Sequence, residues 1–89
     1  MISLIKIEPQ DDYNLKLYFS DDSCGTLDFS YVLKAQSSLT QSLESLEYFQ
    51  DCFIDFGALC WKNGLELSAE SLYQKCKEYR SLHVNQASA

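Results

Sequence analysis

The sequence predicts a two-layer α+β fold, in which an antiparallel sheet of about five strands packs against a C-terminal helix. Three observations predict it. Tyr13–Phe19 alternates apolar and polar residues with the period of a half-exposed strand. Asn63-Gly64 is a strong turn signal. Ser68 then precedes an amphipathic helix as a natural N-cap.

The size and composition of the chain predict one small globular domain. Its 89 residues are 46% hydrophobic and 13% aromatic, which suits a packed core rather than disorder. We expect residues 1–83 to form the domain and residues 84–89 to form a loose tail.

The first half of the chain is predicted to be a three-stranded meander. Residues 2–8 form its first strand, with Ile5 and Ile7 on one face, and Pro9 ends that strand. Residues 20–25 have turn composition, with Gly25 suited to a positive φ. Residues 26–29 return as a short third strand, whose edge could pair between subunits.

Short helices are predicted between the meander and the second half. Ser30 could cap a brief helix over residues 31–35. Residues 36–51 have apolar residues at helical spacing, but their serines compete with a helical backbone. We therefore expect one or two helical turns there, after a loop.

The second half is predicted to be a hairpin followed by the terminal helix. Residues 52–56 and 58–61 form the hairpin strands around Gly57. Leu67 and Leu72 are placed as a hydrophobic staple around the Ser68 cap. The apolar stripe of the helix consists of Ala69, Leu72, Tyr73 and Cys76.

Charge excludes some partners. There are 13 acidic and 7 basic residues, a net charge of −6, which disfavours nucleic acid and anionic membrane surfaces and favours a basic protein. Only Lys75, Lys77 and Arg80 lie close together among the bases, where they complement the dipole of the terminal helix. With no signal peptide or membrane span expected, we predict a cytoplasmic protein.

The sequence offers no catalytic constellation, so we expect neither an enzyme nor a cofactor or metal site. The Asp pairs at 11–12 and 21–22 lie on turns at opposite ends of a strand, too far apart to act together. His83 stands alone near the end of the chain. Cys24 is the one thiol expected to be accessible, with no base beside it, while Cys52, Cys60 and Cys76 are expected in the core.

The string Trp61-Lys62-Asn63-Gly64-Leu65-Glu66-Leu67-Ser68 followed by Leu72-Tyr73 resembles domain of unknown function family 2442. Strand 13–19, the segment 27–30 and the segment 53–57 extend the resemblance over residues 2–75. Lys62 stands where this family often has proline. The resemblance implies a small bacterial α+β domain. Some members carry a repressor-like helix-turn-helix for which this sequence has no counterpart, and the gene neighbourhoods of others suggest toxin–antitoxin pairs.

The favoured hypothesis is a non-enzymatic protein-interaction domain, in the role of the antitoxin in a toxin–antitoxin-like pair. The alternative is a small-molecule-binding regulatory domain with a pocket between the sheet and the terminal helix. The candidate partner- or ligand-binding residues are Trp61, Asn63, Tyr73, Tyr18 and Tyr48. Whether Trp61 belongs to the core or to a contact surface is left open, as is homo-oligomerisation.

Overall fold

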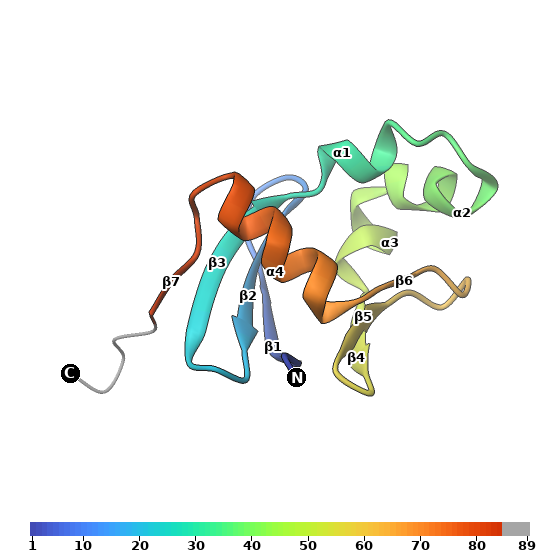
Figure 1. Cartoon of the computed structure of the whole chain (residues 1–89). Helices are drawn as coiled ribbons and strands as arrows, with labels where there is room; N and C mark the ends of the chain where they lie inside the picture. Colours follow the sequence, from blue (N-terminus) through green and yellow to red (C-terminus); the bar gives the residue numbers. More distant parts are fainter. Residues whose placement is uncertain (85–89) are drawn as a thin grey trace.

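A computed structural model gives the fold and describes residues 1–84. The predicted α+β class is confirmed, with antiparallel strands and a C-terminal helix. The strands form two sheets, however, rather than one sheet of about five. In Figure 1 the four-stranded sheet A stands on the left, the three-stranded sheet B on the lower right and the short helices on the upper right.

Sheet A has the strand order β1-β2-β3-β7. Its strands are β1 (Leu4–Pro9), β2 (Asn14–Phe19), β3 (Ser23–Asp28) and β7 (His83–Val84). In β2 the side chains of Leu15, Leu17 and Phe19 are fully buried, so the alternation of apolar residues predicted the inner face of this strand correctly.

The first strand begins at Leu4 rather than at residue 2, and its inner face differs from the prediction. The register between β1 and β2 shifts between Leu4 and Lys6, and such a bulge turns the following side chains. Leu4 is therefore buried, whereas Ile5 is 59% exposed and does not share the half-buried position of Ile7. The strand ends at Pro9, as expected, with Pro9 as its last residue opposite Leu15, a position that proline tolerates on an edge strand.

The turn before β3 is shorter than predicted, because Ser23, Cys24 and Gly25 already belong to the strand. The left-handed residue of this turn is Asp22, with φ 68°. Gly25 serves close packing instead, since a Cβ there would lie 3.2 Å from Sγ of Cys76. The edge of β3 is covered at Ser23 and Cys24 by β7. This pairing does not reach residues 26–29, the edge expected to pair between subunits.

Four short helices connect the two sheets: α1 (Ser30–Leu33), α2 (Ser38–Gln41), η1 (Ser42–Glu44) and α3 (Leu46–Gln50). Serines start two of them. The Ser37 hydroxyl accepts from the Thr40 N–H, and the Ser45 hydroxyl accepts from the Tyr48 N–H. These serines cap helices rather than interrupt one, so the segment contains more helical turns than predicted.

Sheet B has the order β4-β5-β6 and is built on the predicted hairpin. Its strands are β4 (Phe53–Asp55), β5 (Ala58–Cys60) and β6 (Glu66–Leu67). The hairpin meets sheet A at its tip, where the Leu4 N–H donates to the Gly57 carbonyl over 2.9 Å. The two sheets are distinct because this contact lies at the tip and not along a ladder with β1.

The terminal helix α4 (Ala69–Glu78) crosses sheet A (Figure 1). The predicted cap is present, since the Ser68 hydroxyl accepts from the Ser71 N–H. Leu72 and Cys76 are fully buried and Tyr73 is half-buried. Of the expected tail at 84–89, Val84 pairs with Ser23 in β7, and 85–89 lie outside the described residues.

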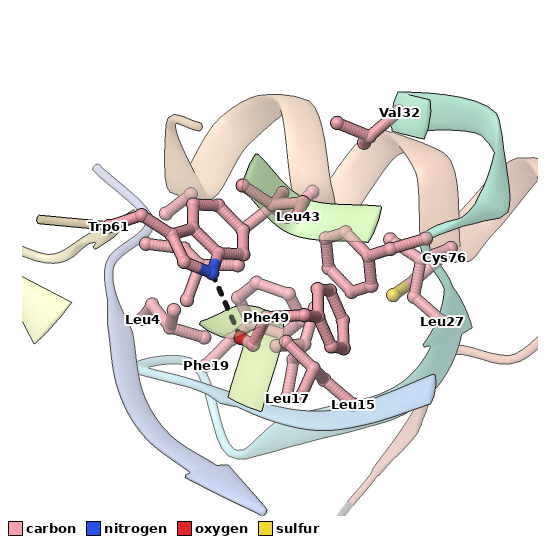
Figure 2. Packing of buried hydrophobic residues seen from close by; sticks show 14 residues of the cluster. Leu4, Leu15, Leu17, Phe19, Leu27, Val32, Leu43, Phe49, Trp61 and Cys76 are labelled. Atoms are coloured by element: carbon pink, nitrogen blue, oxygen red, sulfur yellow. Dashed lines mark hydrogen bonds between the residues drawn. The ribbon is translucent and has the colours of Figure 1, made fainter. Parts of the chain in front are cut away.

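Side chains from both sheets, α1, η1, α3 and α4 share one core (Figure 2). Phe29, Phe49 and Trp61 are in mutual ring contact at its centre, with centroids 5.6–6.4 Å apart. Because both sheets contribute side chains to this cluster, they cannot be displaced without opening the core. No helix within residues 1–84 is long and apolar enough to cross a bilayer.

Candidate functional site

Trp61 lies in the core. It is 2% exposed, and its indole N–H donates to the Phe49 carbonyl over 2.9 Å (Figure 2). A buried indole needs such an acceptor, and here the main chain supplies it. Trp61 therefore acts in packing, although the residue also lines a small hollow described below.

Asn63 joins the turn before β6 to α2. Its side-chain amide donates to the Leu39 carbonyl over 2.8 Å, and its side-chain carbonyl accepts from the Leu65 N–H over 3.1 Å. These bonds tie the turn before β6 to α2, so the polar atoms of Asn63 are used within the fold. In this turn Gly64 takes the left-handed conformation, with φ 96°.

Tyr73 links α4 to the turn between β2 and β3. Its hydroxyl donates to the Asp21 carboxylate over 2.7 Å, and its ring meets the edge of Phe19 at 5.2 Å. The hydrogen bond to Asp21 raises the pKa of Tyr73. The side chains of Leu72, Tyr73 and Cys76 pack closely between α4 and sheet A. They fill the place at which the alternative hypothesis puts a ligand pocket.

Tyr18 lies on the outer face of sheet A, away from α4. The ammonium groups of Lys6 and Lys16 lie 5.2 and 5.3 Å from its ring centroid. Its hydroxyl donates to Glu8, and this bond, followed by the one from Lys6, lowers the pKa of the Glu8 carboxyl. The cations are thus neutralised in part by a neighbouring carboxylate.

Tyr48 borders an open hollow of about 570 Å³ on α3. The other residues that line this hollow are Ser45, Glu47, Gln50 and Asp51. Asp51 also pairs with Lys62 over 3.0 Å. The hollow is polar and acidic, a character suited to a cationic partner surface. Tyr48 therefore lies apart from Tyr18 and Tyr73, and the five candidates do not form one site.

A smaller hollow, of about 170 Å³, lies on sheet B. It is lined by Phe53, Asp55, Cys60, Trp61, Gly64, Leu65 and Glu66. Of these only Trp61 was a candidate from the sequence. The available signal was the Phe56-Gly57 turn, because a large apolar residue stands where asparagine or aspartate is usual.

The structure corrects the expectation for Cys24 and His83. Cys24 is 1% exposed rather than accessible, and Nε2 of His83 lies 3.3 Å from its sulfur. Nδ1 of His83 lies 2.9 Å from the Ser81 carbonyl. This contact fixes Nδ1 as the donor and leaves Nε2 to accept from the thiol. The pair has the elements of an activated thiol, but His83 and β7 cover the sulfur.

The other three thiols are partly or fully buried and have raised pKa values. Burial raises the pKa of Cys52 to about 11 and also raises the pKa of Cys60 and Cys76. Such thiols stay protonated near neutral pH and react slowly. Within residues 1–84, no group of three or more His, Cys, Asp or Glu side chains is placed to hold a metal ion.

Comparison with known proteins adds one match. The model of a family described as "Protein of unknown function (DUF2442)" matches residues 4–78. No curated protein and no solved structure matches the chain.

Proposed function

The chain belongs to the DUF2442 family, and from that premise we propose that it is a non-enzymatic protein-interaction domain with a basic partner. The net charge of −6 supports the sign of the partner. An acidic surface raises the encounter rate with a basic protein and repels phosphate-bearing ligands.

The observation that carries the proposal is the surface formed by residues 39–66. This stretch holds five acidic residues, Glu44, Glu47, Asp51, Asp55 and Glu66, against one basic residue, Lys62. Lys62 is paired with Asp51. The same stretch also carries exposed apolar side chains, namely Leu39, Leu46, Phe53 and Phe56. Apolar anchors among charges of one sign are typical of a protein-docking surface.

The more specific role we propose is that of the neutralising protein in a bacterial toxin–antitoxin-like pair, acting in the cytoplasm. Its support is the resemblance stated above together with the acidic surface. A protein that neutralises a basic toxin needs a complementary charge, and an interface of that kind does not require a catalytic group.

Affinity capture tests the proposal. The tagged chain, incubated at low salt with lysate of the source cells, should retain one basic protein in near-equimolar amount. That protein, purified and titrated calorimetrically, should bind with an affinity that falls as salt is raised. The result that overturns the proposal is an empty eluate, or a partner whose affinity is independent of salt.

Matched variants place the interface. E44Q/E47Q removes two charges from the surface of residues 39–66, and D22N/E70Q removes two exposed charges elsewhere. We expect the first pair to weaken binding about three- to tenfold and the second to change it less than twofold. Equal effects of the two variants would mean that net charge alone matters, and would contradict an interface on this surface.

A further inference from the structure

The hollow on sheet B has an ordered floor. Phe53, Cys60 and Glu66 are neighbours across the three strands, and Asp55 shares their face at the end of β4. Of the lining residues, Cys60 and Trp61 are buried, and Phe53 is 43% exposed. The opposite face of the sheet contributes Leu59, Leu67 and Ile54 to the core. The hollow is thus backed by rigid packing.

Two carboxylates border this apolar floor. Asp55 and Glu66 are exposed and belong to β4 and β6, on either side of Cys60. Burial raises the pKa of the Cys60 thiol, and the charges of Glu66 and Asp55 raise it further. Both charges are therefore felt at the same sulfur atom. None of the described residues that line the hollow is basic.

The hairpin tip beside Asp55 carries an unusual residue. Phe56 has φ 49° and is fully exposed, and Gly57 follows with φ 76°. Two positive φ values are what a tight hairpin turn of this kind requires, and asparagine or glycine normally supplies the first. A phenylalanine there is strained and leaves an aromatic ring in water. A strained residue with an exposed ring is a candidate contact residue.

We propose that this hollow binds an arginine side chain of the partner protein, with Phe56 contacting the partner surface next to it. The inference rests on the proposed function and names the place and chemistry of its contact. A volume of about 170 Å³ suits one side chain, since pockets for small molecules usually measure about 300–1,000 Å³.

Arginine fits this site better than lysine. Its planar guanidinium has donors on two edges, which can bond Asp55 and Glu66 together, and its flat face stacks on aromatic rings such as Phe53. Its aliphatic stem covers apolar surface such as Leu65. A lysine ammonium is a compact charge that would use one carboxylate at a time.

The direct test is a titration of the ¹⁵N-labelled chain with N-acetyl-arginine amide, followed by NMR. Trp61 lines the hollow and is the single tryptophan, so its indole N–H gives one unambiguous signal from a lining residue. We expect saturable shifts of this signal and of the amides of Cys60, Leu65 and Glu66. The matched lysine amide should bind at least about threefold more weakly, and the shifts caused by the norleucine amide should not saturate.

Variants separate this inference from the proposed function. D55N/E66Q should weaken arginine-amide binding about three- to tenfold, while E44Q/E47Q removes the same charge and should leave it unchanged. Absent or non-saturable shifts overturn the inference, as does equal binding of the lysine amide. If a purified basic partner binds D55N/E66Q and wild type equally, the inference is wrong while the interaction function stands. If the amide binds as expected and no partner is captured, the hollow stands and the interaction function is wrong.

Discussion

The indole nitrogen of Trp61 lies 2.9 Å from the carbonyl oxygen of Phe49, and the two aromatic rings are 6.0 Å apart between centroids (Figure 2). This pair joins the end of β5 to α3 in the centre of the core. The hydrogen bond explains why a tryptophan occupies a nearly inaccessible position. It also satisfies a carbonyl near the end of α3, where the last carbonyls of a helix lack a backbone N–H donor within the helix.

Replacing Trp61 by phenylalanine should destabilise the domain by about 2–4 kcal/mol, because it removes the donor to Phe49 and leaves a cavity where the indole was. Urea unfolding followed by far-ultraviolet circular dichroism measures this loss without needing the tryptophan signal. Lys62→Ala removes only an exposed ion pair and should cost less than about 1 kcal/mol. Equal stability of W61F and wild type would contradict the assigned role.

Removing the N-cap of α4 should lower the free energy of unfolding by about 1 kcal/mol. In Ser68→Ala the Ser71 N–H loses its acceptor, and an unpaired donor at the first turn destabilises the helix. Ser68→Asp keeps an acceptor and adds a charge that the helix dipole favours, so it should stay near wild type. Thermal unfolding of the three proteins measures the difference. If S68A and S68D lose the same stability, the cap makes no contribution.

The Asp21 carboxylate should make stability depend on pH in acid. Its bonds to Ser23, and then to Tyr73, lower its pKa below the ordinary value of 3.8. The unfolded chain therefore takes up this proton first as pH falls, and the stabilisation is complete above the unfolded pKa and lost as pH falls through the native pKa.

Urea midpoints measured from pH 6 down to pH 2 test the Asp21 prediction. Asp21→Asn should be less stable than wild type at pH 6, and the two curves should converge at the acid end. Asp22→Asn, which removes a charge from the same turn, should keep the wild-type slope. Parallel curves for D21N and wild type would show that the Tyr73 and Ser23 bonds do not favour the ionised carboxylate.

His83 should protect Cys24 from thiol reagents. Since its imidazole lies against the sulfur of an otherwise buried cysteine, His83→Ala should increase the rate at which a disulfide reagent labels Cys24, measured by mass spectrometry of peptides. Cys52 is half-buried and serves as the internal reference. Arg80→Ala, an exposed change near the same end of α4, should leave the Cys24 rate unchanged. An unaltered rate in H83A would mean that β7 does not cover Cys24 in solution.

The sequence predicted elements whose signals are local. The alternation ending in Phe19 placed β2, and Ser68 placed the start of α4, because a period or a cap is visible within a few residues. The bulge in β1 was not predicted, since it changes which side chains face the core without changing composition. Ile5 was therefore assigned to the wrong position.

Contacts between distant segments were not predicted. β7 has only two residues and no pattern of its own, and it pairs with a strand some 60 positions earlier. The contact of His83 with Cys24 depends on that pairing, so an isolated histidine gave no sign of it. The hollow on sheet B likewise depends on register, since it aligns Phe53, Cys60 and Glu66 across three strands.

Phe56→Asn should stabilise the fold and weaken partner binding together. Asparagine adopts the left-handed conformation of position 56 with less strain and removes an exposed ring, so we expect a gain of about 0.5–1 kcal/mol. The same change deletes the aromatic contact proposed beside the hollow, and the affinity for the basic partner should fall.

Gly57→Ala is the control for the turn itself. An alanine at position 57 would have φ 76°, and its Cβ would lie 3.0 Å from the Ser3 side chain. This substitution should therefore lower the free energy of unfolding by about 1 kcal/mol or more. Urea unfolding and calorimetric titration of the three proteins distinguish the two roles of Phe56. If Phe56 serves folding, F56N should be less stable than wild type. If Phe56 serves partner contact, F56N should be more stable and should bind the partner more weakly.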